Sequence, residues 1–197
     1  PRIVDSSGFA AHASRLSGAP PICGVAGDQQ ASLVGQAAVR PGLAKITFGT
    51  GGMLDMVTDA GAPTTGNRTA EGTFPIVAWS RDGHLTWGVE AIMLSAGTNV
   101  EWLVSDLGIL STPAESHDVA AQCDTTDGVT YVPALMGLGT PYWDYGARGT
   151  MLGLTRGSGR PQIARAVLEG VAQRGADLVD AAVASTGHEV PVVRVGG

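Results

Sequence analysis

An aspartate at a predicted strand-to-helix junction is the residue best placed for acid–base chemistry. Asp28 lies in the run Gly-Asp-Gln-Gln at residues 27–30, and the glycine-rich run Gly-Thr-Gly-Gly follows at residues 49–52. A carboxylate can accept the proton of a hydroxyl group, and a glycine-rich turn lets backbone amides approach a phosphate. Together the two motifs predict phosphoryl transfer to a hydroxyl group.

Both motifs also have a purely structural interpretation. An aspartate at the start of a helix can serve only as its N-cap, which is worth about 1 kcal/mol. The run at residues 49–52 can be an ordinary hairpin turn, and it is no Walker A loop because no Gly-Lys-Ser/Thr follows it. On the residues alone, both interpretations stay open.

Composition and charge restrict the class of protein. The 197 residues are 44% hydrophobic and 15% charged, with 29 glycines, which is typical of an α/β domain with many tight turns. The net charge of −6 argues against binding to nucleic acid, and no apolar run has membrane-spanning length. Cys23 and Cys123 are expected to be buried free thiols, which favours a reducing cytoplasm.

The apolar pattern predicts the elements that position the two motifs. Residues 1–20 lack periodicity and are expected to form an interdomain linker that leads into a domain. The elements expected next are a buried strand at 22–26, a helix at 28–39, strands at 43–48 and 53–58, and a hairpin at 74–80 and 84–89. A helix is expected at 91–107, where Gly97 would cost about 1 kcal/mol and close approach of a ligand would explain it.

The second half alternates helices with strands. The pattern predicts a helix at 116–123, a strand at 129–135, the longest helix at 161–183 and a last strand at 190–195. The loop at 137–148 is either a structural turn or the rim of a cleft, with Asp144 and Arg148 as a candidate ion pair. Hairpins followed by this alternation predict an α/β fold with a mixed sheet. The final strand and Gly-Gly suit a piece of a longer protein.

Four stretches in this order resemble the FGGY carbohydrate kinases, and within that family the glycerol kinases. They are Ile-Cys-Gly-Val-Ala-Gly-Asp-Gln-Gln at 22–30, Phe-Gly-Thr-Gly at 48–51, Gly-Leu-Gly-Thr-Pro-Tyr-Trp-Asp at 137–144, and the stretch 149–169. The resemblance implies an actin-like ATPase (ribonuclease H-like) fold. It also implies that residues 21–197 form the family's C-terminal domain, truncated at its C-terminal end and without the N-terminal domain.

The resemblance implies an activity as well. It implies a phosphotransferase that uses ATP and Mg²⁺ to phosphorylate a primary hydroxyl of a polyol or sugar, with glycerol as the favoured substrate. The alternatives are a kinase for a pentulose, gluconate or erythritol, and a non-catalytic nucleotide-binding paralogue. The missing domain would complete the cleft, so this chain alone is expected to be inactive. A homo-oligomer is compatible with the resemblance.

Candidate site residues come from the matching motifs. Asp28 matches the general base, Gln29 matches a residue that hydrogen-bonds substrate hydroxyls, and Met53 stands where Phe usually contacts the substrate's carbon chain. Met53 weakens the assignment to glycerol, whereas Gln29-Gln30 supports it because xylulokinase-like relatives usually carry Asp-Asn there. The expected nucleotide contacts are Thr50, Gly49, Gly51, Gly97, Glu101 (where many relatives have Gln) and Gly197. The resemblance assigns no residue of this chain to the metal.

Overall fold

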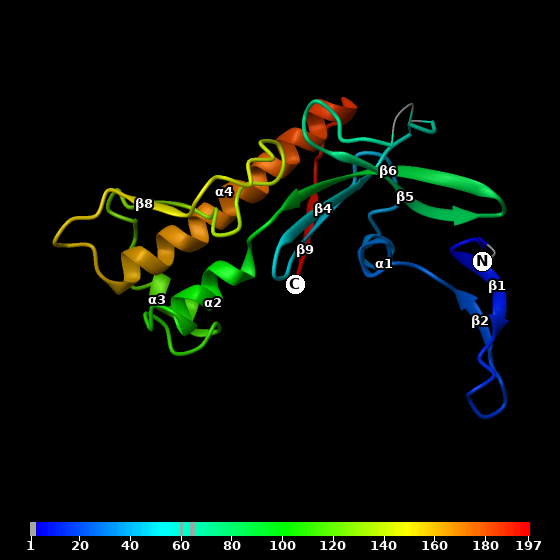
Figure 1. Ribbon diagram of the computed structural model, residues 1–197, viewed down its shortest axis with the longest axis horizontal. Helices are drawn as coiled ribbons and strands as arrows, with labels where there is room; N and C mark the ends of the chain where they lie inside the picture. The colour runs from blue at the N-terminus through cyan, green and yellow to red at the C-terminus, as the bar shows by residue number, and fades with distance from the viewer. Residues whose placement is uncertain (1–2, 60, 64–65) are drawn as a thin grey trace.

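The computed structural model describes residues 3–59, 61–63 and 66–197. The helices are α1 (Asp28–Gly35), α2 (Gly97–Ser105), α3 (Glu115–Ala120) and α4 (Arg160–Thr186). The strands are β1 (Ser7–His12), β2 (Pro21–Gly24), β3 (Ala44–Phe48), β4 (Gly52–Val57), β5 (Phe74–Arg81), β6 (His84–Met93), β7 (Thr130–Val132), β8 (Thr150–Leu152) and β9 (Val193–Gly196). The chain is elongated, with the β1–β2 hairpin at one end and the β7–β8 hairpin at the other (Figure 1).

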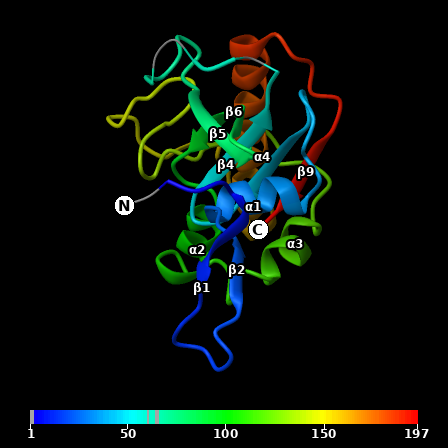
Figure 2. The same cartoon turned by 90° about the vertical axis from the view of Figure 1, so that its right-hand side faces the viewer.

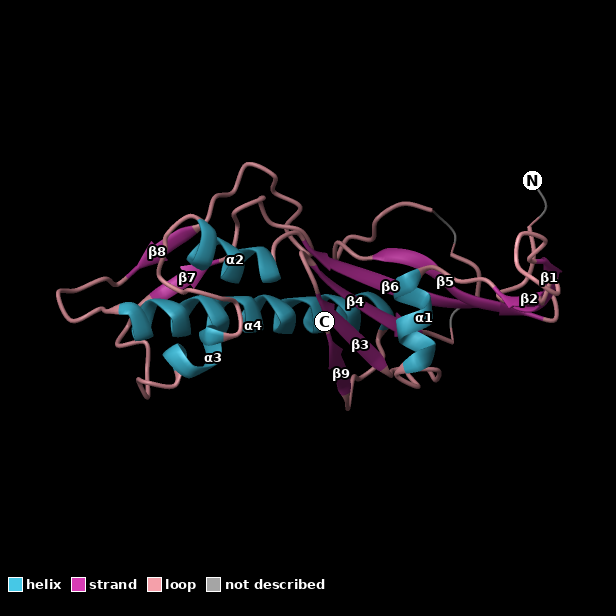
Figure 3. Ribbon diagram, turned by 90° about the horizontal axis from the view of Figure 1, so that it is seen from below, coloured by secondary structure: helices cyan, strands magenta, loops and turns pink. Residues whose placement is uncertain are grey.

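A five-stranded mixed sheet in the order β5-β6-β4-β3-β9 forms the centre. Its neighbouring strands are antiparallel except β3 and β9, which run parallel. Helix α1 covers one face of this sheet and α4 packs on the other (Figures 2 and 3). The predicted class, an α/β fold with helices packed on a mixed sheet, is therefore confirmed.

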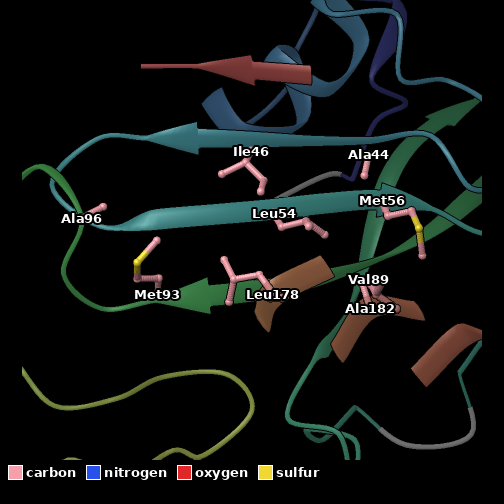
Figure 4. Close-up of a cluster of buried hydrophobic side chains, with 10 residues drawn as sticks. Ala44, Ile46, Leu54, Met56, Val89, Met93, Ala96, Leu178 and Ala182 are labelled. Atoms are coloured by element: carbon pink, nitrogen blue, oxygen red, sulfur yellow. The ribbon is translucent and has the colours of Figure 1, made fainter. Parts of the chain in front are cut away.

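The face of the sheet that meets α4, here called the α4 face, is apolar. Side chains alternate between the two faces of a strand, so every second residue of β3, β4 and β6 points toward α4. The buried cluster of this face is Ala44, Ile46, Leu54, Met56, Val89, Ala91, Met93 and Ala96, together with Leu178 and Ala182 of α4 (Figure 4). This cluster is the main core of the domain.

The opposite face, here called the α1 face, mixes apolar and charged side chains. Leu33 of α1 packs with Val57 of β4 in a small buried cluster. Beside that cluster, Lys45 of β3 and Asp55 of β4 are fully buried and occupy paired positions. Glu90 of β6 pairs with Asp55 in turn, so three charged residues lie in one row across three strands.

Helix α4 connects two hydrophobic clusters. It carries Pro161 in its first turn, where a missing backbone N–H costs nothing, and it ends at Gly187, whose φ of 73° suits glycine. Leu178 belongs to the sheet core, whereas Val167 belongs to a second cluster that α2 and α3 share. The predicted longest helix is thus confirmed. No helix in the described ranges is both long and apolar enough to cross a membrane.

The predicted helix at 91–107 is wrong in its first third. Strand β6 continues to Met93, because Ala91 and Met93 pair with Leu54 and Gly52 of β4. Helix α2 then begins at Gly97. Gly97 therefore does not interrupt a helix but starts one. Helix α1 also ends earlier than predicted, at Gly35, because Ala37 turns the chain with a φ of 53°.

The N-terminal region differs most from the predicted elements. Residues 7–12, where no strand was predicted, form β1, which pairs with β2 instead of leaving β2 to join the central sheet. All four residues of β2 are exposed, so the strand expected at 22–26 is present at Pro21–Gly24, but the prediction that it is buried is wrong. Cys23 is likewise an exposed free thiol rather than a buried one, and Cys123 is a half-buried free thiol.

The predicted ion pair between Asp144 and Arg148 does not form. The Asp144 carboxylate accepts hydrogen bonds from the backbone N–H groups of residues 146 and 147. The Arg148 guanidinium donates to the carbonyl oxygens of residues 145–147. Both side chains therefore stabilise their own turn. The loop is fixed further by Trp143, whose indole N–H donates to the Gly72 carbonyl at 2.7 Å.

Candidate functional site

Asp28 is the first residue of α1, and the N-cap position belongs to Gly27. Oδ1 of Asp28 accepts a hydrogen bond of 2.9 Å from the backbone N–H of Gln29, and the side chain is exposed. The N-cap residue makes no side-chain cap hydrogen bond. The interpretation of Asp28 as the N-cap is therefore wrong, and its carboxylate remains accessible to a ligand.

Gln29 and Met53 are directed to the same face of the sheet as Asp28. Oε1 of Gln29 accepts a hydrogen bond from Nζ of Lys45 on β3. Met53 pairs with Thr47, which lies two residues beyond Lys45 on the same face, and Met53 is half-buried. The structure thus brings all three predicted substrate residues to the α1 face.

The glycine-rich turn joins β3 to β4, as predicted, and it is held by the start of α2. The backbone N–H of Ala96 donates to the Thr50 carbonyl at 2.9 Å, and the N–H of Gly97 donates to the Gly49 carbonyl at 2.8 Å. The Thr98 hydroxyl also donates to the Thr50 carbonyl at 3.3 Å. The start of α2 thus fixes the backbone of the turn. The Thr50 side chain is exposed, so its hydroxyl is accessible to a ligand.

Three of the predicted nucleotide glycines are required by the backbone itself. A Cβ atom on Gly51 would lie 2.7 Å from the Met93 carbonyl oxygen, one on Gly97 would lie 2.6 Å from the Gly49 carbonyl oxygen, and one on Gly197 would lie 2.2 Å from the carbonyl oxygen of Phe48. Real Cβ atoms essentially never approach so closely. The turn itself, rather than a ligand, therefore explains why position 97 needs glycine.

Four of the six predicted nucleotide residues line one open pocket of about 500 Å³ at the end of the sheet. This volume lies within the range of about 300–1,000 Å³ that is usual for small-molecule sites. The lining residues are Phe48, Gly49, Thr50, Gly97, Thr98, Glu101, Val104, Ser105 and Pro113. Gly51 and Gly197 are not among them. Here we call this space the turn pocket.

A buried charge cluster beneath Gln29 was not predicted from the sequence. Nζ of Lys45 lies 2.6 Å from Oδ2 of Asp55, and both side chains are fully buried. Burial raises the pKa of Asp55 against the opposing effect of Lys45, and the Asp28 charge raises it further. The pKa of Glu90 is raised as well, first by burial and then by the charge of Asp55. One signal was present: two opposite charges inside apolar strands.

The family to which this chain belongs follows from comparison with known proteins. The model of the FGGY family of carbohydrate kinases, C-terminal domain, matches residues 44–197. Glycerol kinase from Oceanobacillus iheyensis is 43% identical over 90% of this chain and 35% of its own length. Glycerol kinase from Aromatoleum aromaticum is 42% identical over all of this chain and 39% of its own length. The chain belongs to the FGGY family of carbohydrate kinases, and it spans little more than a third of these relatives.

Solved structures agree with this assignment. Plasmodium falciparum glycerol kinase with ADP superposes with a TM-score of 0.79 at 32% identity, covering 91% of this chain and 35% of that one. A xylulose kinase from Brucella ovis gives 0.78 at 30% identity, covering 100% and 39%. The fold is therefore that of the FGGY kinases, the actin-like ATPase fold that the resemblance implied.

Proposed function

We propose that the full-length protein to which this chain belongs phosphorylates glycerol, using ATP to form glycerol 3-phosphate. The observation that carries this proposal is the placement of Asp28 and Gln29 over β3, the strand that ends in the Thr50 turn. An acid and a hydroxyl-binding amide thus lie above the same strand that leads into the glycine-rich turn. The 43% identity to a glycerol kinase supports glycerol as the substrate.

Each substrate residue has a defined task in this proposal. Asp28 accepts the proton of the attacking hydroxyl, Gln29 hydrogen-bonds a substrate hydroxyl, and Met53 contacts the carbon chain. Phosphoryl transfer needs little covalent participation by the protein, because positioning and charge stabilisation supply most of the catalysis. The roles of these residues therefore depend chiefly on how firmly the α1 face holds them.

The turn pocket is the proposed nucleotide site. The Thr50 hydroxyl and the glycines at 49 and 51 would contact the phosphates, while Gly97 and Gly197 hold the backbone around them. The Glu101 carboxylate can only accept hydrogen bonds from the nucleotide. Mg²⁺ would be held largely by phosphate oxygens and water, as is usual where the ion accompanies a nucleotide.

The remaining length of the relatives supports a second domain. These relatives are more than twice as long as the part that matches this chain. We assign the opposite wall of the cleft to that additional N-terminal part, and closure of the two domains would exclude water during transfer. The two free thiols suit a cytoplasmic enzyme.

A second candidate is a kinase for another sugar or polyol. Met53 replaces the Phe that glycerol kinases usually carry, and a xylulose kinase superposes almost as well as a glycerol kinase. This candidate keeps the same base and the same turn pocket. It changes only the hydroxyl compound that lies against Met53 and Gln29.

A substrate panel tests the proposal. The full-length protein is assayed for ADP release with glycerol, a pentulose, gluconate and erythritol, each at saturating ATP. Glycerol should give the highest kcat/KM, and absence of turnover with glycerol would end the favoured version. The isolated 197-residue chain is assayed beside it and should be inactive. Glycerol-dependent ATP hydrolysis by that chain would contradict the assignment of the second wall.

A further inference from the structure

The Lys45 ammonium group is surrounded by three side chains on the α1 face. It donates to Oε1 of Gln29 and, at 3.0 Å, to the Thr47 hydroxyl, and it forms the ion pair of 2.6 Å with Asp55. The Lys45 side chain is fully buried. An ammonium group in such a position needs compensation for lost hydration, and its three donors have three oxygen-bearing partners.

The chemistry of lysine fixes the orientation of Gln29. An ammonium group has donors and no acceptor, whereas a carboxamide has an oxygen that accepts and a nitrogen that donates. Gln29 must therefore present Oε1 to Lys45, which directs its Nε2 group elsewhere. Gln29 is half-buried, and its Nε2 group has no hydrogen-bond partner among the described residues. The amide N–H groups are thus available to a ligand.

Asp55 holds Lys45 in this place. Its Oδ2 lies 2.6 Å from Nζ of Lys45 in an ion pair, and neither carboxylate oxygen has a hydrogen-bond partner in the described ranges. A second carboxylate, Glu90, occupies the paired position on β6. Negative charge therefore gathers along the row of paired positions beside Lys45. An uncompensated charge in the interior is strongly unfavourable, so Lys45 and Asp55 stabilise each other's position.

We propose that Lys45 is a positioning residue that orients Gln29 as a hydrogen-bond donor to a substrate hydroxyl. The proposal rests on the proposed kinase function. It adds that Gln29 is the donor, and the substrate hydroxyl the acceptor, of the hydrogen bond between them. A hydroxyl oxygen that accepts from Nε2 must direct its own proton to another acceptor. The carboxylate of Asp28, the neighbouring residue, is that acceptor. Lys45 would thereby fix the direction of the hydrogen bonds that lead to the base.

A double-mutant cycle in the full-length protein tests this assignment. Lys45→Met combined with Asp55→Leu removes both charges, so neither is left buried alone. This pair of changes and Gln29→Ala should each raise the KM for glycerol about tenfold, the effect of one lost hydrogen bond. All three changes together should again give about tenfold, because Lys45 acts through Gln29. The KM for ATP should stay within about twofold.

Two further variants separate positioning from general stability. Gln29→Glu keeps an oxygen for Lys45 but has no N–H, so it should weaken glycerol binding as much as Gln29→Ala does. Arg174→Met removes another buried cation, one that donates to Thr140 and Asp177 from α4. It should lower the Tm and leave the KM for glycerol unchanged.

Additive effects of about a hundredfold in the triple variant would overturn the proposal, as would an unchanged KM in the Lys45→Met/Asp55→Leu variant. If the wild-type protein does not use glycerol, the proposed substrate fails, and the cycle is measured with the best substrate of the panel. A crystal structure of the Lys45→Met/Asp55→Leu variant tests the role of Lys45 without an activity measurement. It should show the Gln29 carboxamide displaced, and an unmoved carboxamide would contradict the role of Lys45.

Discussion

The two faces of the central sheet are built from the same strands but have opposite chemistry. On the α4 face, Leu54 and Met56 pack against Leu178 in an apolar core. On the α1 face, Lys45 and Asp55 form a buried ion pair. Helix α1, which begins with Asp28, covers this face of the sheet (Figure 2). A fully apolar face is the better way to stabilise a sheet, because burying charges costs hydration.

The alternation of side chains along each strand separates the apolar core from the face that carries the candidate site. Neighbouring residues of β4, such as Leu54 and Asp55, serve different faces. Changes on the α4 face should therefore affect folding, and changes on the α1 face should affect chemistry.

The largest effect is expected from Asp28→Asn in the full-length protein. General base catalysis contributes roughly 10²–10⁴-fold, so kcat should fall by that factor. The Tm should change little, because Asp28 is exposed and is not the N-cap of α1. Steady-state ADP release and a thermal melt measure both quantities. Turnover that survives within a few-fold would show that the assignment of Asp28 as the general base is wrong.

Leu178→Ala should lower the stability of the protein and leave its kcat unchanged, the reverse of Asp28→Asn. Leu178 is fully buried in the sheet core, and replacing such a leucine with alanine costs about 2–5 kcal/mol of stability. Urea unfolding measures the loss, and the folded variant should keep its kcat and both KM values. Leu152→Ala is the matched control, since Leu152 is 60% exposed and its replacement should cost little. A fall in kcat without a loss of stability would break the division of the faces.

A smaller effect is expected where the turn pocket meets α2. Gly97→Ala places a methyl group 2.6 Å from the Gly49 carbonyl oxygen, so the turn must move. We expect the KM for ATP to rise about tenfold, as for one lost hydrogen bond, and the KM for glycerol to change less. Gly35→Ala is the control, because its methyl group would meet no atom within 4 Å. Equal changes in both KM values would place the turn outside the nucleotide site.

The smallest effect concerns the pH dependence of stability. The pKa of Glu90 is raised in the folded chain, from an ordinary value of 4.5, so the folded state binds its proton more tightly than the unfolded state does. Its contribution to stability is therefore present at low pH and is lost as pH rises through the raised pKa. Glu90→Gln removes this loss. The Tm of the variant relative to wild type should rise between about pH 4 and pH 8, and a constant difference would contradict the burial of charge on the α1 face.

Local patterns predicted the elements that carry strong periodicity or clear turn residues. The long helix ending at Gly187 and the hairpin around Thr50 are confirmed. The segment at 91–107 was misassigned because an apolar strand running into an apolar helix has no break in hydrophobicity. Its division at Gly97 depends on pairing with β4, which the local sequence does not encode.

The candidate site, too, could be predicted only in part from the sequence. The motifs identified Asp28, Gln29 and Thr50. The structure places the first two in α1, where Gln29 contacts Lys45 of β3, and places Thr50 in the turn that follows β3. Their roles remain predictions. The contact of Lys45 with Asp55 was missed because it depends on the register of β3 against β4. That register follows from the whole sheet and not from either strand alone.

The most direct test of the proposed site on the α1 face is a crystal structure of the full-length protein with glycerol and ADP. One glycerol hydroxyl should lie within about 3.2 Å of the Asp28 carboxylate, the reach of a general base. The Gln29 amide nitrogen should contact a glycerol hydroxyl, and the ADP phosphates should lie beside Thr50. Glycerol bound away from the α1 face, or ADP outside the turn pocket, would contradict the proposed roles of these residues.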